Sequence, residues 1–82
     1  MSAGSKWRQA YQVIRERIRS GELAAGDRVP TIFELMTEFS MSNTVAQKVH
    51  RQLRLYGLIE TEAGTGHYVL PDAAEKVKAA ES

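Results

Sequence analysis

The hydrophobic pattern of the chain begins with a helical repeat. After Ser5, apolar side chains return every three or four residues, which predicts a helix from Lys6 to about Ser20. The side chains of its apolar stripe are Trp7, Ala10, Tyr11, Ile14 and Ile18. Because Gly21 follows as a stop signal, the segment predicts one amphipathic helix with a single face against a core.

Two shorter helices are predicted next, separated by a break of only three residues. Thr31 and Glu34 have the spacing of a capping box, in which each side chain satisfies a free backbone N–H at the start of a helix. This first helix spans residues 31–39, and Ser42 is the N-cap of a second one over residues 42–56. So tight a connection predicts a helix-turn-helix, whose second helix enters a DNA major groove.

After Gly57 the pattern changes to extended chain. Residues 58–63 alternate loosely between apolar and polar, 64–66 supply a glycine-rich turn, and 67–70 return as a second strand. A short strand is also predicted at residues 28–29. A ribbon directly after a helix-turn-helix is a wing, so we predict an α+β, mainly α fold: a winged helix-turn-helix of three helices with a two- or three-stranded β wing.

The length of 82 residues allows one small domain. We expect residues 1–5 to be a disordered N-terminus, 6–71 to form the winged helix-turn-helix domain, and 72–82 to be a tail or a truncated linker. Residues 73–81 are rich in Ala, Lys and Glu and are capable of forming a helix. They carry few apolar side chains, so we do not expect them to dock firmly.

The composition excludes several classes of function. Without cysteine the chain has neither disulfides nor thiolate metal ligands, and its two histidines lie in different predicted elements. We therefore expect no enzyme, no cofactor and no metal site. No apolar run approaches the roughly 20 residues that span a membrane, and no secretory signal opens the chain. The expectation is a cytoplasmic protein, associated with the nucleoid, that has no membrane partner.

The net charge of +1 conceals an uneven distribution. Residues 1–56 carry nine basic side chains against five acidic ones, whereas residues 57–82 carry two against five. Helix 42–56 has three basic residues and no acid, together with amide and hydroxyl groups near its start. Amide side chains pair with adenine edges, and the methyls of Val45 suit a thymine methyl. Taken alone, the segment fits either a DNA-reading helix or an ordinary surface helix.

Several side chains outside that helix face allow two interpretations. Arg8, Arg15 and Arg19 share one flank of the first helix, which is either a solvated face or an edge that touches phosphates. We expect His50, on the apolar side of helix 42–56, to be a core or edge residue rather than a ligand or a base. His67, beside the predicted turn, is either a groove contact or simply exposed.

Two groups of short sequence runs carry a family resemblance. The first joins IRSGEL at 18–23 to GDRVPT at 26–31, and the second joins GLI at 57–59 to GTGHYV at 64–69. From residue 11 to 69 the chain resembles the DNA-binding domain of the GntR family of bacterial transcription regulators. The resemblance implies a winged helix that works as a homodimer on a palindromic double-stranded DNA operator. A small-molecule effector is implied only if a C-terminal domain exists beyond residue 82.

The chain departs from the family at basic positions. The family usually has Arg where this chain has Phe33, Asn43 and Gln47, and Lys or Arg where it has Thr65. The resemblance and the charge pattern together give the following candidate DNA-binding residues: Thr31, Phe33, Ser42, Asn43, Thr44, Val45, Gln47, Lys48, Arg51, Gly64, Thr65, Gly66 and His67.

Two functional hypotheses follow. The first is a sequence-specific DNA-binding transcription regulator, a repressor, which reads the major groove with helix 42–56 and the flanking groove with the 60–70 wing. The second is a winged-helix protein-interaction module that has lost strong DNA binding. The acids Glu60 and Glu62 on the wing, and an exposed Phe33, would favour the second hypothesis.

Overall fold

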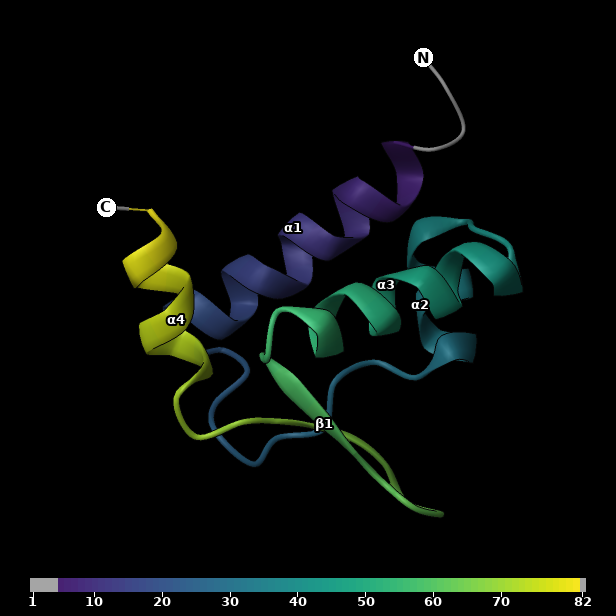
Figure 1. Ribbon diagram of the computed structural model, residues 1–82. Helices are drawn as coiled ribbons and strands as arrows, with labels where there is room; N and C mark the ends of the chain where they lie inside the picture. Colours follow the sequence, from purple (N-terminus) through teal and green to yellow (C-terminus); the bar gives the residue numbers. More distant parts are fainter. Residues whose placement is uncertain (1–4, 82) are drawn as a thin grey trace.

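The computed structural model describes residues 5–81, and its helices form a bundle from which a β-ribbon projects (Figure 1). The elements in chain order are α1 (Ser5–Ser20), α2 (Ile32–Phe39), α3 (Asn43–Leu55), β1 (Ile59–Glu62), β2 (Gly66–Val69) and α4 (Ala73–Ala80). The predicted α+β, mainly helical winged fold is confirmed, with a fourth helix added. The disorder expected for residues 1–5 lies outside the described residues except at Ser5, where α1 begins.

The core is built around α1 and α3. Helix α1 packs against α3 and α4, and α2 packs against α3. The largest fully buried side chains of the three N-terminal helices are Ile14, Ile18, Leu35, Val49 and Leu53. Burying each of these contributes roughly 1.5–3 kcal/mol relative to leaving it exposed. The apolar stripes read from the sequence therefore supply the packing that fixes α2 and α3 relative to each other.

Both helices of the helix-turn-helix begin at the caps that the sequence predicted. The Thr31 hydroxyl accepts from the Glu34 amide at 3.1 Å, and the Glu34 carboxylate accepts from the Thr31 amide at 2.8 Å. At the start of α3, the Ser42 hydroxyl accepts from the amide of Val45 at 3.3 Å. Ser40 closes α2 in the left-handed region, with φ of 52°. These local bonds fix where each helix begins and where the first one ends.

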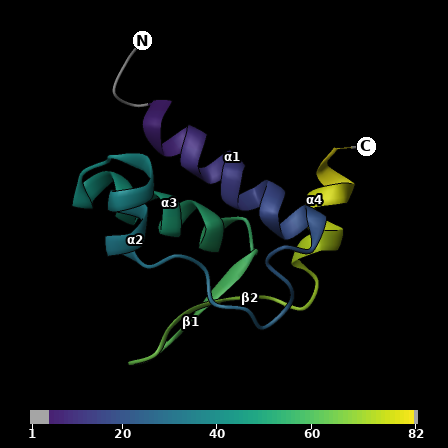
Figure 2. The same ribbon diagram turned by 180° about the vertical axis from the view of Figure 1, so that it is seen from behind.

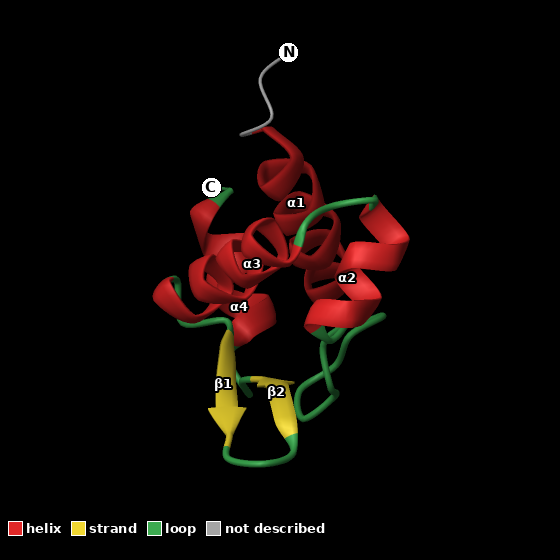
Figure 3. Cartoon of the chain, turned by 90° about the vertical axis from the view of Figure 1, so that its right-hand side faces the viewer, coloured by secondary structure: helices red, strands yellow, loops and turns green. Residues whose placement is uncertain are grey.

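The wing is an antiparallel ribbon in which Ile59 pairs with Val69 and Glu62 with Gly66. It extends away from the helices, as Figure 3 shows from the side. Arg28 forms an isolated bridge with Tyr68, so the predicted third strand is reduced to a single bridging residue. Main-chain bonds on either side of this bridge tie the segment before α2 to the wing.

The C-terminal segment corrects the expectation that it would not dock. Ala73 and Val77 are only 0% and 2% exposed, and α4 lies alongside α1 (Figure 2). Two apolar side chains one turn apart are enough here because they join the same core cluster as Ile14 and Ile18 of α1. The count of apolar residues alone did not reveal this match.

Ion pairs at one end and a hydrogen bond near the other secure the same helix. Arg15 and Arg19 of α1 pair with Glu81 at 3.7 and 3.0 Å, next to the C-terminal end of α4. Near the other end, Lys76 donates to the Gly57 carbonyl at 3.1 Å. Arg15 and Arg19 are therefore neither a simply solvated flank nor a free edge for phosphates. Among the described residues, no helix is both long and apolar enough to cross a bilayer.

Candidate nucleic-acid interface

The polar face of α3 stands clear of the core. Thr44, Gln47 and Arg51 are exposed, and Lys48 is half-buried. These positions share one face because they follow the helical repeat, and the opposite face carries the buried side chains of the core. The surface that would have to meet a DNA duplex is therefore not covered by the rest of the described chain. This exposure is required if α3 is a reading helix.

Lys48 is held in place by α1. Its ammonium nitrogen lies 4.7 Å from the centroid of the Trp7 ring, and the Arg8 guanidinium lies 5.5 Å from the same ring. Such cation–π contacts contribute about 0.5–1 kcal/mol at exposed sites. The sequence placed Trp7 only in the apolar stripe of the first helix. Its ring also positions the Lys48 ammonium group at the candidate interface.

The N-terminal turn of α3 presents a paired amide unit. The Gln47 side-chain NH₂ donates to the Asn43 side-chain carbonyl, and both residues are exposed. This arrangement leaves the Asn43 NH₂ and the Gln47 carbonyl oxygen unused, one donor and one acceptor. Adenine presents the complementary acceptor and donor in the major groove. The Ser42 hydroxyl, in contrast, already accepts the Val45 amide at the cap.

The basic side chains of α3 differ from those of the rest of the chain. Of the seven arginines in the sequence, only Arg51 and Arg54 make no hydrogen bond, ion pair or ring contact within residues 5–81. Arg28, for example, donates to the Thr65 carbonyl at 3.0 Å. Arg51 was a predicted site residue, whereas Arg54 was not singled out as one. Two unpaired guanidiniums on one helix make this face a strong attractor of anions.

The wing tip is braced by the protein itself. Gly64 and Gly66 have φ of 80° and 131°, values that residues with a side chain rarely adopt. The carbonyl of the exposed Thr65 accepts from Arg28 at 3.0 Å and from the Tyr68 hydroxyl at 3.3 Å. Sequence reasoning gave Arg28 only a strand position and missed its role as a brace. The three predicted tip residues therefore form one ordered turn.

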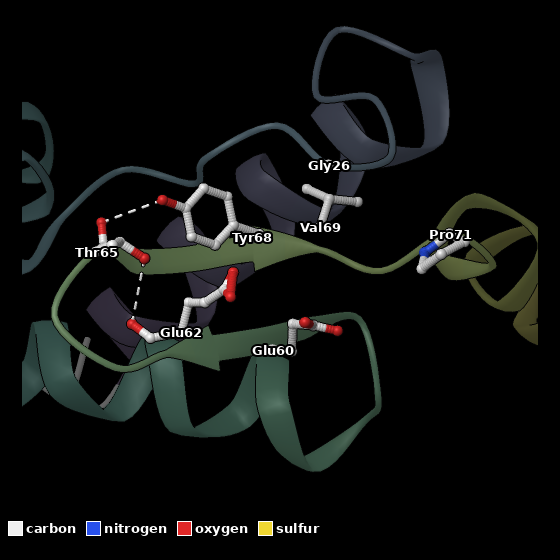
Figure 4. A pocket seen from close by; sticks show the side chains of 7 residues that line it. All are labelled: Gly26, Glu60, Glu62, Thr65, Tyr68, Val69 and Pro71. Atoms are coloured by element: carbon white, nitrogen blue, oxygen red, sulfur yellow. Dashed lines mark hydrogen bonds between the residues drawn. The ribbon is translucent and has the colours of Figure 1, made fainter.

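The two faces of the ribbon carry different chemistry. Glu60 and Glu62 lie on the face that carries Tyr68, where they line an open hollow with Thr65 (Figure 4). Because neighbouring side chains in a strand point to opposite faces, Thr61 and His67 lie on the other face, toward α3. The two acids are thus directed away from the candidate reading helix.

His50 of α3 and His67 of β2 form a contact that connects helix and wing. Their ring centroids are 4.2 Å apart, and His67 also hydrogen-bonds Thr61 at 3.0 Å. His67 is therefore half-buried and not simply exposed. Burial lowers the pKa of both imidazoles, and the charge of Arg54 lowers both further.

His50 is buried, as the sequence predicted, at 3% exposure. Its Nε2–H donates to the Pro30 carbonyl at 2.7 Å, which leaves Nδ1 buried and without a partner. Within the described part of the chain, no cluster of three or more His, Cys, Asp or Glu side chains is arranged to hold a metal ion. The orphaned nitrogen therefore needs another explanation.

Phe33 and Thr31 lie beside this contact. Phe33 is 67% exposed in the first turn of α2, which is the condition under which it favours a protein-interaction module. With Thr31, it lines a shallow hollow that also includes His50 and His67. A large apolar side chain therefore stands in the open next to the polar face of α3.

The sequence is similar to that of known bacterial regulators. The pattern described as "Bacterial regulatory proteins, gntR family" matches residues 6–69. The chain is 41% identical over 63 residues to the mannosyl-D-glycerate transport/metabolism system repressor MngR of Escherichia coli, covering 77% of this chain and 26% of that protein. It is 30% identical over 67 residues to the HTH-type transcriptional repressor YtrA of Bacillus subtilis, covering 82% and 52%.

The fold is similar to solved structures of the same kind. A GntR family transcriptional regulator from Listeria monocytogenes superposes with a TM-score of 0.84 at 27% identity, over 92% of this chain and 68% of that one. AraR(DBD) in complex with operator ORR3 gives a TM-score of 0.74 at 30% identity, over 78% of this chain and 77% of that one. The chain spans about half or less of the length of the curated relatives it matches.

Proposed function

This chain belongs to the gntR family of bacterial regulatory proteins, and on that basis we propose that it is the operator-binding part of a transcriptional repressor. Two relatives, MngR and YtrA, are named as repressors, and AraR(DBD) is solved with an operator. Because the relatives are longer than this chain, the identity of the whole regulator and its target genes belongs to the proposal. It includes no catalytic step, cofactor or metal.

The single observation that carries the proposal is the uncovered face of α3. In the proposed complex, α3 lies in the major groove with Thr44 and the Asn43–Gln47 amide unit toward base edges. The methyls of the half-buried Val45 are directed to a thymine methyl. Lys48 and Arg51 supply the charge that neutralises phosphates and orients the helix. Bound in this way at a promoter, the protein would block access sterically.

The wing and the start of α2 complete the proposed contact. The Gly64–Gly66 turn follows the adjacent minor groove, where its backbone approaches closely because neither glycine has a Cβ. Thr31, Phe33 and Ser42 are placed at the edge of the major groove, with Thr31 and Ser42 using hydroxyl protons that their caps do not consume. His67 joins the wing to α3 rather than reading bases.

Assembly and control are further parts of the proposal. A homodimer would bind two half-sites whose centres are about one helical turn apart, as two-fold symmetric regulators do. A small-molecule effector would act through a further domain, for which the greater length of the relatives leaves room. Family membership also supports a location in the cytoplasm, at the nucleoid.

A protein-interaction module is the second candidate function. The observation in its favour is the 67% exposure of Phe33. This apolar side chain stands at a position where the family usually has an arginine. The direction of Glu60 and Glu62, away from α3, removes the argument that the wing repels DNA from the reading helix. The first candidate therefore has the stronger support.

A selection from random double-stranded DNA at low salt separates the two candidates. The proposal predicts an enriched palindromic sequence, and Lys48→Ala and Arg51→Ala should each weaken binding and flatten its salt dependence. Lys78→Ala is the matched control, an exposed basic residue on α4, a helix that lies away from the wing tip (Figure 1). If no sequence is enriched, the protein-interaction module is the better account.

A further inference from the structure

A pocket opens where α3 faces the wing, and it shares only Gln47 with the residues proposed to read bases. Its volume is about 260 Å³, and its lining residues are Ile32, Gln47, His50, Arg51, Arg54 and His67. Helix α3 contributes four of these, β2 contributes His67 and α2 contributes Ile32. The pocket therefore bridges the two elements that the proposed complex places in different DNA grooves.

The pocket is positively charged and contains no acid. Arg51 and Arg54 are three residues apart on α3, so their side chains lie on neighbouring positions of one face. Neither pairs with a carboxylate, although Arg15, Arg17 and Arg19 of α1 all do. Like charges at this spacing repel each other, which indicates that an anion is the missing partner.

One of the histidines that line the pocket, His50, has a buried nitrogen that lacks a partner as well. His50 is 97% buried, and its Nδ1 has no hydrogen bond. Buried polar atoms without a partner are rare because the lost hydrogen bond to water is not replaced. Protonation of His50 would turn this nitrogen into a donor, and an oxyanion bound in the pocket would favour that protonation.

The geometry of a DNA duplex suggests which anion this is. A sugar–phosphate strand separates the major groove from the adjacent minor groove. A protein with its helix in one groove and its wing in the other must straddle that strand. The pocket lies between helix and wing, where the strand has to pass.

We propose that this pocket binds a phosphoryl oxyanion, supplied by one backbone phosphate of the operator, with Arg51 and Arg54 as its paired donors. His50 and His67 close the site between helix and wing. The inference rests on the proposed function and deepens it, because Arg54, His50 and His67 then set how far α3 and the wing open around the strand. Arg54 then raises affinity by the same factor for every DNA sequence, since a phosphate carries no base identity.

Binding of the phosphate at this site is coupled to protonation of His50. The charged and titratable groups around His50 are Arg51 and Arg54 from α3 and His67 from β2, while the segment before α2 offers only the uncharged Pro30 carbonyl. Burial and the nearby Arg54 keep the pKa of His50 below its ordinary value in the free protein. A bound phosphate opposes both effects, so DNA binding takes up a proton and affinity rises as the pH falls.

The first test compares Arg54→Ala with the control Lys78→Ala on an operator obtained by selection. Arg54→Ala should weaken binding about tenfold and by the same factor on unrelated duplexes, because a charge-assisted phosphate contact is lost. Arg54 is exposed, so the variant should unfold at the same temperature as the wild type. Equal affinity of Arg54→Ala and Lys78→Ala for the operator would overturn the inference.

The second test removes the partner instead of the protein group. Single neutral methylphosphonates are placed in turn along the operator, and one position should weaken the wild type but leave Arg54→Ala unaffected. Losses that simply add at every position would overturn the phosphate assignment. His50→Leu should abolish the increase of affinity between about pH 8 and pH 6, and His67→Thr is a second variant for the same readout.

A third measurement identifies the source of the oxyanion. Inorganic phosphate, with chloride at equal ionic strength as reference, is titrated into the free protein while NMR signals of Arg54 and His50 are followed. Shifts that saturate at millimolar phosphate, with no methylphosphonate effect, would assign the pocket to a free phosphate instead of the operator backbone. A wild type that enriches no operator overturns the proposed function, and the same titration then decides for or against the oxyanion site.

Discussion

Helices α1 and α3 both carry arginines, but the two helices use them in opposite ways. On α1, Arg17 pairs with Glu38 of α2 and with Glu22 at 3.5 Å, and its neighbours pair with Glu81. On α3, Arg51 and Arg54 have no partner within the described residues. Arg15, Arg17 and Arg19 of α1 therefore tie the helix to other parts of the fold, whereas the arginines of α3 remain available to a ligand. Net charge alone conceals this division of roles.

The largest expected effect is on DNA binding by α3. Replacing Arg51 and Arg54 together by Ala should lower operator affinity by about 3 kcal/mol, roughly a hundredfold, since each charge-assisted bond contributes about 1.5–3 kcal/mol. Stability should not fall, because no contact within the protein is removed. Fluorescence anisotropy and thermal unfolding measure the two quantities. A loss of stability that matches the loss of affinity would mean that these arginines support the fold after all.

The next largest effect concerns the docking of α4. Weakening it should lower stability and leave DNA binding unchanged, the reverse of the arginine variants. Val77→Ala removes two buried methyl groups and should lower the free energy of unfolding by about 2 kcal/mol. Operator affinity, measured well below the unfolding temperature, should be unchanged because α4 lies away from the wing tip. Chemical denaturation checks the first value. Unchanged stability would return the segment to the loosely attached tail expected from the sequence.

Replacing a single arginine of α1 should give a smaller loss of stability, again without a change in DNA binding. Arg17→Ala removes the ionic link between α1 and Glu38 on α2, whose two side chains are 25% and 39% exposed. Solvent still screens such a pair, so it contributes about 0.5–1 kcal/mol. The unfolding midpoint should drop by a few degrees, by less at high salt, while the salt slope of DNA binding stays constant. If Arg17→Ala flattens the salt slope of DNA binding as Arg51→Ala does, the arginines of α1 and α3 do not differ in role.

The smallest expected effect concerns pH and the free protein. Burial lowers the pKa of His50 and His67 in the fold, so the unfolded chain binds protons first as the pH falls below about 6.5. Stability is therefore fully present above that pH and declines below it. The unfolding midpoint should be a few degrees lower at about pH 5.5 than at about pH 7.5. The decline should be weaker in His50→Leu, and an equal decline would assign it to other groups.

Local signals in the sequence predicted most of the fold. The caps at Thr31 and Ser42, the stop at Gly57 and the glycine turn at 64–66 each act within a few residues of chain, so their spacing is sufficient to locate them. The docking of 73–80 depends on a match with α1, a surface that spacing within the segment does not describe.

The candidate site was predictable only in part, for the same reason. Exposure of Thr44, Gln47 and Arg51 follows from the helical repeat, whereas the partners of each arginine depend on where distant acids lie. The contact between His50 and His67 had one signal in the sequence, a histidine on an apolar helix face that requires a nearby polar partner. Which face Glu60 occupies required the strand register, because a shift of one residue reverses it.

The most direct test of the central claim is the salt dependence of operator binding by the wild type and by the Arg51→Ala, Arg54→Ala double variant. A plot of log affinity against log salt concentration has a slope of about 0.9 for each phosphate neutralised. If the unpaired arginines of α3 together neutralise one operator phosphate, the slope of the double variant should be smaller by about 0.9. Parallel lines for the two proteins would contradict the account, because both charges would then be idle at the duplex.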